Sequence, residues 1–175
     1  IDDPKVTLIA ITTPNHLHYP MAMAAIAAGK AVYCEKPLAV NLGQANAMHL
    51  AAKDAGVVTR VGYNYQHNPI IGLARELIQS GRLGEIISFQ GEFSEDFMAD
   101  PASPWSWRCE AEHAGGALAD LGSHLLGMAR YLLGNVEAVC AETFGDVPLP
   151  QLGDFVENLP VVQQLLLKIS LANIG

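Results

Sequence analysis

Residues 6–15, VTLIAITTPN, decide the fold, because an apolar, β-rich run is followed at once by a polar turn. The run 6–11 lacks strict alternation of apolar and polar side chains, a pattern typical of a parallel strand buried on both faces. An alanine-rich stretch then continues to Ala28, with Pro20 acceptable in the first turn of a helix and Gly29 as its stop. The segment therefore predicts a strand, a turn and a helix in succession.

Two further units of the same kind follow, with strands expected at 31–34 and 57–63. Asn41 can cap the helix between these strands, and Asn68 can cap the helix after them. The order β-α-β-α-β-α is typical of a parallel, doubly wound α/β sheet. In such sheets ligands lie beyond the carboxyl ends of the strands. Three polar clusters fall there, at 13–15, 35–37 and 64–65.

The pattern changes after Gly84. Residues 86–93 partly alternate, as a strand with an exposed face does, and a glycine pair at 115–116 precedes a helix that we expect to end at Leu133. Between this strand and this helix we expect an irregular segment at 96–113. After the helix we expect a strand at 136–144, and at 161–169 either a strand or a short helix. We therefore expect two partial domains, 1–84 and 85–175. Since the chain starts at Ile1 in what reads as a loop in mid-fold, we expect it to be a fragment.

Composition excludes several classes of protein. Half of the residues are hydrophobic, only 16% are charged, and the formal net charge is -8, which argues against binding to nucleic acid or to an anionic membrane surface. No apolar run reaches the roughly 20 residues that a membrane span needs. The three cysteines are odd in number and form no CxxC pair, which favours a reducing, cytoplasmic location. These cysteines are Cys34, Cys109 and Cys140.

The spacing of Asp120 and His124 suggests acid–base chemistry. Four residues apart, they would share one face of a helix, where the carboxylate could orient the imidazole. Lys36, at a strand end, could polarise a hydroxyl group, with Glu35 as its partner and Pro37 fixing the turn. An ordinary surface pair, a buried and satisfied histidine, and an exposed turn lysine remain open alternatives.

Two weaker interpretations concern the irregular segment. A metal site would need ligands such as Glu112 or His113, but no HExxH motif or Cys/His cluster supports one, so we expect none. Trp105, Trp107 and Arg108 suit stacking on a sugar and binding of its hydroxyl groups, although packing explains the tryptophans equally well.

The combination of motifs resembles the glucose–fructose oxidoreductase / inositol dehydrogenase / rhizopine-catabolism family. The runs that carry the resemblance are TPNHLH at 13–18, AGKAVYCEKPLA at 28–39, VGYNY at 61–65, GRLGEI at 81–86 and GGALADLGSH at 115–124. They occur in the family's order and cover roughly residues 2–144. The pair EKP and GGxxxDxGxH is the most specific part.

The resemblance implies the C-terminal half of a Rossmann domain, then part of an α/β domain with a large open, mainly antiparallel sheet, often used for homo-oligomerisation. It implies NAD or NADP, and hydride transfer to or from a secondary alcohol of a sugar, inositol or related polyol. By position, His124 would be the acid/base, Asp120 its orienting or substrate-binding partner, and Lys36 the group that activates the hydroxyl. The cofactor would lie near Thr13, Pro14, Asn15, His18, Glu35, Lys36 and Pro37, and the substrate near Asn64, Arg108, Asp120 and His124.

The sequence departs from the family's pattern in three ways. The GxGxxG turn would precede Ile1, Gly127 replaces a frequent acidic residue, and Gln66 replaces a frequent arginine, which puts recognition of charged substrates in doubt. Without the glycine-rich turn the pyrophosphate loses its helix N-terminus, so this piece alone should bind cofactor poorly. Two alternatives therefore stay open: an NAD-using glycosidase of the same fold, and a truncated, non-catalytic sensor or assembly module.

Overall fold

The computed structural model describes residues 1–95, 102, 104–136 and 163–170. Its first part is a three-stranded sheet in the order β1-β2-β3, built from Leu8–Ile11, Ala31–Cys34 and Thr59–Val61. Both ladders are parallel: Ile11 lies opposite Cys34, and Cys34 opposite Val61. The expected parallel α/β sheet is confirmed, although β1 and β3 are shorter than the sequence pattern indicated.

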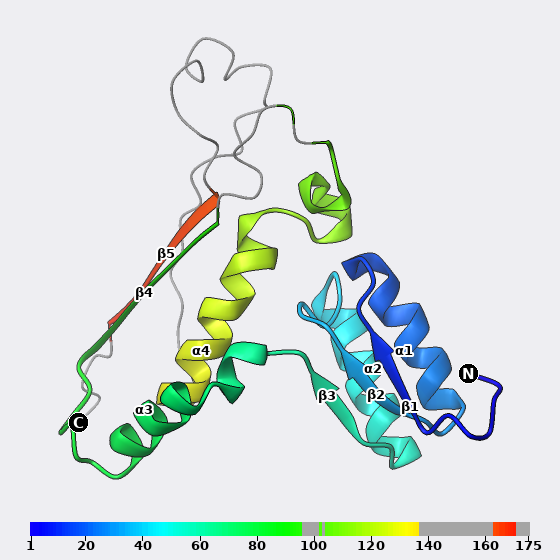
Figure 1. Ribbon diagram of the computed structural model, residues 1–175, viewed down its shortest axis with the longest axis horizontal. Helices are drawn as coiled ribbons and strands as arrows, with labels where there is room; N and C mark the ends of the chain where they lie inside the picture. The colour runs from blue at the N-terminus through cyan, green and yellow to red at the C-terminus, as the bar shows by residue number, and fades with distance from the viewer. Residues whose placement is uncertain (96–101, 103, 137–162, 171–175) are drawn as a thin grey trace.

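Two helices, α1 (His18–Ala27) and α2 (Leu42–Ala55), cover this sheet (Figure 1). Ile11, Ala25 and Met48 are among the buried residues between helices and sheet. Along β1, however, Leu8 is 54% exposed while Ile11 is buried. The prediction of a strand buried on both faces is therefore wrong for the described residues, because their helices supply one covering layer only.

The ends of α2 follow the predicted chemistry. The Asn41 side chain accepts a hydrogen bond from the Gln44 amide at 2.9 Å, and Gly56 ends the helix in the left-handed region at φ 66°. A side-chain cap of this kind contributes about 1 kcal/mol, and glycine tolerates positive φ because it has no Cβ. Local sequence thus determined where this helix starts and stops.

The second part begins after β3. It contains a short 3₁₀ turn, η2 (Asn64–His67), and helices α3 (Pro69–Gln79) and α4 (Ser123–Leu133), with a π-helical turn, η5 (Leu118–Gly122), leading into α4. Strands β4 (Ser88–Glu95) and β5 (Gln163–Ser170) form an antiparallel pair, so the ambiguous segment at 161–169 contains a strand. α4 contacts α3, β4 and η2, and lies beside the β4–β5 pair in Figure 1.

A large open sheet is not seen in the described ranges, which hold only this two-stranded antiparallel pair outside the parallel sheet. The strand expected at 136–144 lies outside the described residues except for Val136, which is in neither a strand nor a helix. Among the helices of the described chain, none combines the length and apolar composition needed to cross a membrane.

Candidate active site

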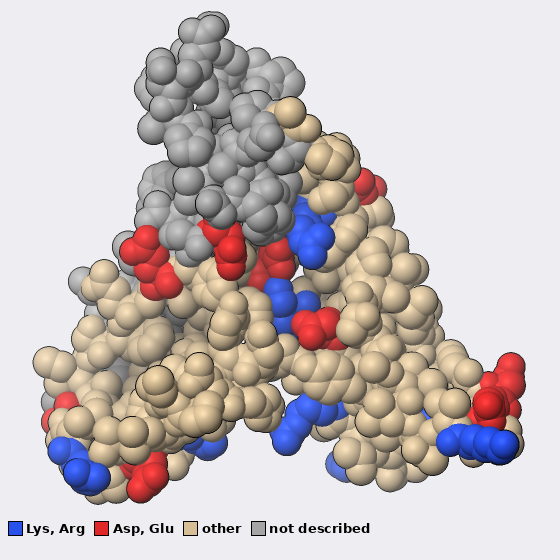
Figure 2. Space-filling model, viewed as in Figure 1, with Lys and Arg blue, Asp and Glu red and all other residues tan. Residues whose placement is uncertain are grey.

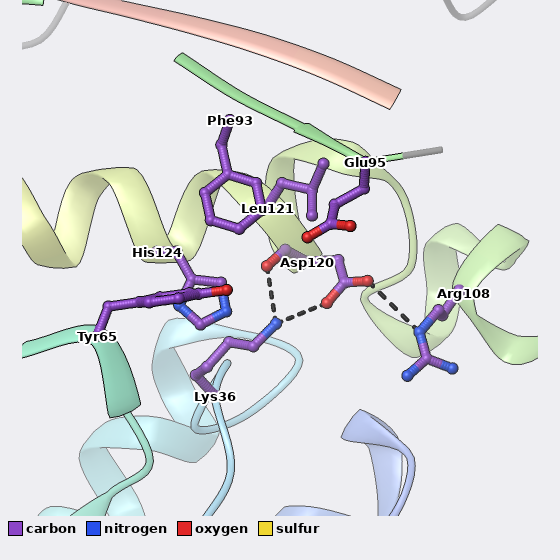
Figure 3. Close-up of a pocket in the computed structure, with 8 residues that line it drawn as sticks. All are labelled: Lys36, Tyr65, Phe93, Glu95, Arg108, Asp120, Leu121 and His124. Carbon is purple, nitrogen blue, oxygen red and sulfur yellow. Dashed lines mark hydrogen bonds and ion pairs between the residues drawn. The ribbon is translucent and has the colours of Figure 1, made fainter. Parts of the chain in front are cut away.

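Lys36 joins the two parts of the chain. It follows the carboxyl end of β2, and its ammonium group donates to Asp120 Oδ1 at 2.6 Å and to the Asp120 carbonyl oxygen at 2.8 Å (Figure 3). The two side chains are only 12% and 13% exposed. Arg108 Nε lies 3.4 Å from the other carboxylate oxygen of Asp120. A single, largely buried carboxylate thus pairs with two cations, closely with Lys36 and at a longer distance with Arg108.

The backbone around Asp120 differs from the expected α-helix. Residues Leu118–Gly122 form a π-helical turn, and the α-helix proper begins at Ser123. Such turns widen the helix locally and are frequent at functional sites. In the part of the chain that the structure describes, Asp120 makes no hydrogen bond to the His124 side chain; its carboxylate is used by Lys36 and Arg108. Among the described residues the expected orienting contact between Asp120 and His124 is therefore not made, and the Lys36 ammonium contacts Asp120 and not Glu35. A substrate-binding role for Asp120 stays a prediction.

Two aromatic rings contact His124 instead. Phe93 stacks on the imidazole with ring centroids 5.5 Å apart and planes 10° apart, and Tyr65 meets it edge-on at 4.8 Å. Burial first, and then the nearby Lys36 charge, lower the pKa of His124 to about 4, against the opposing effect of Asp120. At neutral pH the imidazole is uncharged, as a proton acceptor must be.

These groups line one pocket of about 380 Å³. Figure 3 shows Lys36, Asp120 and His124 converging on it, with Phe93 on the far side from Lys36. Three lining residues, Phe93, Glu95 and Leu121, have no counterpart among the site residues expected from the sequence. Tyr65 lies in the expected polar cluster at 64–65, but no role was assigned to it. Phe93 and Glu95 reach the site only because β4 packs against α4 in the tertiary structure. Alternation along β4, which puts Phe93 and Glu95 on one face, is the signal that could have found these two.

A second pocket, of about 330 Å³, adjoins the first and shares Lys36, Arg108 and Asp120 with it. It lies beyond the ends of β1 and β2, at the carboxyl edge of the sheet. Five of the seven residues expected near a cofactor line it: Thr13, Pro14, Asn15, Glu35 and Lys36. Trp107 also lines it and carries the Arg108 guanidinium over its ring at 4.4 Å.

The remaining expected residues do not line either pocket. His18 is completely buried, and its two ring nitrogens each lie 2.9 Å from a backbone carbonyl oxygen, one of Thr13 and one of Pro37. It therefore ties together two loops that lead to the second pocket. Asn64 accepts a hydrogen bond from the Tyr65 amide at 3.0 Å. Its neighbour Tyr65, and not Asn64, lines the pocket that holds His124.

Glu35 lies close to the backbone of β3. A Cβ on Gly62 would come within 2.6 Å of Glu35 Oε1, so a larger residue at position 62 would displace that carboxylate from its present place. Its other oxygen accepts the Lys36 backbone N–H at 3.2 Å. Glu35 thus fixes the loop that presents Lys36.

Two of the three departures from the family's pattern, Gln66 and Gly127, contact each other. Gln66 Nε2 donates to the Gly127 carbonyl oxygen at 3.0 Å, and a Cβ on Gly127 would meet the Tyr63 ring at 2.8 Å. Gln66 lies outside the pocket that holds His124. Gln66 therefore contributes to packing between η2 and α4.

Glu110, Glu112 and His113 form a separate group whose potential ligand atoms lie within 4.8 Å of one another. Glu112 is exposed, and Glu110 pairs with His113, whose ring stacks on His16 at 4.0 Å. The close contact between Glu110 and His113 holds the group together, and the group lies outside the two adjoining pockets.

Comparison with known proteins agrees with this architecture. Residues 1–63 match the family model described as an oxidoreductase family with an NAD-binding Rossmann fold, and residues 71–157 match the GFO/IDH/MocA C-terminal domain. The chain is 47% identical over 142 residues to levoglucosan dehydrogenase of Pseudarthrobacter phenanthrenivorans, covering 81% of this chain and 36% of that protein. It is 34% identical to the NADP-dependent scyllo-inositol 2-dehydrogenase of Bacillus subtilis, covering 80% and 38% of the two chains.

A solved structure of levoglucosan dehydrogenase in complex with NADH and levoglucosan superimposes with a TM-score of 0.72 at 43% identity, over 77% of this chain and 36% of that one. The present chain thus spans little more than a third of the length of these relatives. Both family models and the order of the motifs agree along the chain. The chain belongs to the Gfo/Idh/MocA family of oxidoreductases.

Proposed function

We propose that this chain supplies the acid–base half of an NAD(P)-dependent dehydrogenase that moves a hydride between nicotinamide and a secondary alcohol of a sugar, inositol or related polyol. The observation that carries the proposal is the convergence of Lys36, Asp120 and His124 on one pocket, with Lys36 Nζ and Asp120 Oδ1 2.6 Å apart. The levoglucosan and inositol dehydrogenases that the chain resembles support the substrate class.

The residues of the second pocket fit a nicotinamide cofactor. Small polar groups from Thr13 and Asn15 line it beside Trp107, a flat apolar surface, and the pocket opens to Lys36 and Asp120. Mixed polar and aromatic walls of this kind suit an amide-bearing ring. When bound, the nicotinamide supplies the acceptor or donor of the hydride. The choice between NAD and NADP stays open.

In the proposed mechanism neutral His124 accepts the proton of the substrate hydroxyl as the alcohol is oxidised. The Lys36 ammonium donates a hydrogen bond to the same oxygen and stabilises the negative charge that develops there. Asp120 holds that ammonium in place by its 2.6 Å contact. Phe93 and Leu121 supply apolar surface to the wall of the pocket.

A direct assay uses the complete gene product with NAD or NADP and a panel of sugars and inositols, following nicotinamide absorbance. We expect His124→Ala to lower kcat by about 10²–10⁴, the usual contribution of general acid–base catalysis. His49→Ala, on the exposed side of α2, is the matched control and should leave turnover unchanged. Normal turnover in His124→Ala would refute the assigned role.

Two other outcomes would replace the proposal. Release of sugar without a net change in nicotinamide absorbance would indicate the NAD-using glycosidase. Failure of both NADH and NADPH to bind the complete gene product would indicate a non-catalytic sensor or assembly module. A titration followed by nicotinamide fluorescence, on this chain and on the longer product, separates these cases.

Three further properties belong to the proposal. The change of sequence pattern near Gly84 favours a domain division there, whereas the contacts of η2 and α3 with α4, and family matches that meet between residues 63 and 71, favour a division directly after β3. The antiparallel β4–β5 pair is the part of the second-domain sheet through which a homo-oligomer would assemble. A cytoplasmic location is supported by the free thiols of Cys34 and Cys109. Size-exclusion chromatography with light scattering tests the oligomer.

A further inference from the structure

We propose that a cleft on the other side of η2 from the His124 pocket binds a phosphate group. The cleft has a volume of about 500 Å³ and lies between the edge strand β3 and helices α3 and α4. Its lining residues are Thr59, Arg60, Val61, Tyr63, Gln66, His67, Arg75 and Tyr131. Every charged or titratable side chain among these is a base or a tyrosine.

The two arginines have no carboxylate partner among the residues that the structure describes. Within the described ranges, neither Arg60 nor Arg75 forms an ion pair, and Arg75 Nε is buried without a hydrogen-bond partner. A buried guanidinium N–H left unpaired costs free energy that an oxyanion ligand recovers. Guanidinium groups also match the geometry of phosphate oxygens, which they bind in a bidentate way.

The cleft is preorganised for such a ligand. The Arg75 guanidinium lies 4.3 Å above the Tyr131 ring, and this cation–π contact fixes its direction. Gln66 uses one amide hydrogen on the Gly127 carbonyl and keeps another. Burial raises the pKa of Tyr63, so its hydroxyl stays a neutral donor. A side chain held in one conformation before binding loses less entropy on binding.

Charge favours an anion here as well. Figure 2 shows Lys and Arg atoms flanking the notch at the lower edge between the two lobes, without acidic atoms beside them. This contrasts with the His124 pocket, where Asp120 and Glu95 accompany Lys36 and Arg108. In a protein with a formal net charge of -8, a cleft whose described lining carries arginines and no carboxylate is locally basic and attracts an anion.

The test titrates the complete gene product with inorganic phosphate, at constant ionic strength in chloride and with NADH present to occupy the dinucleotide site. Calorimetry or ³¹P line broadening reports binding. We expect the double variant Arg60→Gln/Arg75→Gln to bind phosphate at least about tenfold more weakly, because it loses two charge-assisted hydrogen-bond donors. The matched control Lys53→Gln/Arg82→Gln removes the same charge from exposed positions and should bind like the parent.

A titration with acetate in place of phosphate tests whether the cleft prefers phosphate to another anion, and acetate should bind more weakly. Arg75→Lys keeps the positive charge but loses the planar guanidinium group that can bind two phosphate oxygens at once. An intermediate phosphate affinity in this variant would show that the weaker binding of the double variant does not come from loss of folding. Equal binding by the parent and Arg60→Gln/Arg75→Gln, or no binding by the parent at millimolar phosphate, would overturn the proposal. Dehydrogenase turnover measured on the same samples tests the proposed function separately, since neither arginine lines the His124 pocket.

Discussion

Replacement of Asp120 by Asn tests whether the Lys36–Asp120 pair holds the two parts of the chain together. Removing one partner of a buried pair costs about 3–5 kcal/mol, because the other charge is left unpaired. Here the side chains keep 12% and 13% exposure, and Lys36 retains the Asp120 carbonyl oxygen as an acceptor at 2.8 Å. We therefore expect a loss of about 2–3 kcal/mol in the free energy of unfolding.

A double-mutant cycle isolates the interaction. Lys36→Met should cost less, about 1–2 kcal/mol, because Asp120 keeps the Arg108 guanidinium 3.4 Å away. The double variant removes both buried charges, so its cost should fall short of the sum of the single variants by about 2 kcal/mol. Urea unfolding followed by circular dichroism measures all four proteins. Single-variant costs that add within about 0.5 kcal/mol would refute a coupled pair.

Three other predictions concern single side chains. The pKa of His124 is lowered from 6.5 to about 4, so on acidification the unfolded chain binds a proton before the folded chain does. The free energy of unfolding should therefore fall as pH drops from 6.5 to 4. In urea titrations at several pH values, His124→Gln should make this fall smaller. Gly127→Ala should cost about 1–3 kcal/mol because its Cβ meets the Tyr63 ring, whereas Gly72→Ala, in open space on α3, should stabilise by about 0.5–1 kcal/mol; thermal unfolding compares them. Asn41→Ala should cost about 1 kcal/mol by the same measurement, and no change would contradict its role as a cap.

Sequence alone determined the local elements of this protein. Hydrophobic runs placed β1, β2 and β3, and the residues Asn41, Gly56 and Asn68 placed helix ends, since capping and positive φ depend on the residue present and its near neighbours. The motifs also indicated Lys36 and His124, which the fold brings to one pocket.

Tertiary structure alone decided how these groups are paired. Helical spacing predicted that Asp120 would contact His124. In the structure Asp120 lies in a π-helical turn, and its carboxylate accepts a hydrogen bond from Lys36, 84 positions away in sequence. The aromatic rings around His124 come from β4 and η2, which no local pattern brings to α4. Periodicity reports which face of an element is apolar, whereas contacts between distant segments depend on packing of the whole chain, and that packing sets the partner and the protonation state of each site residue.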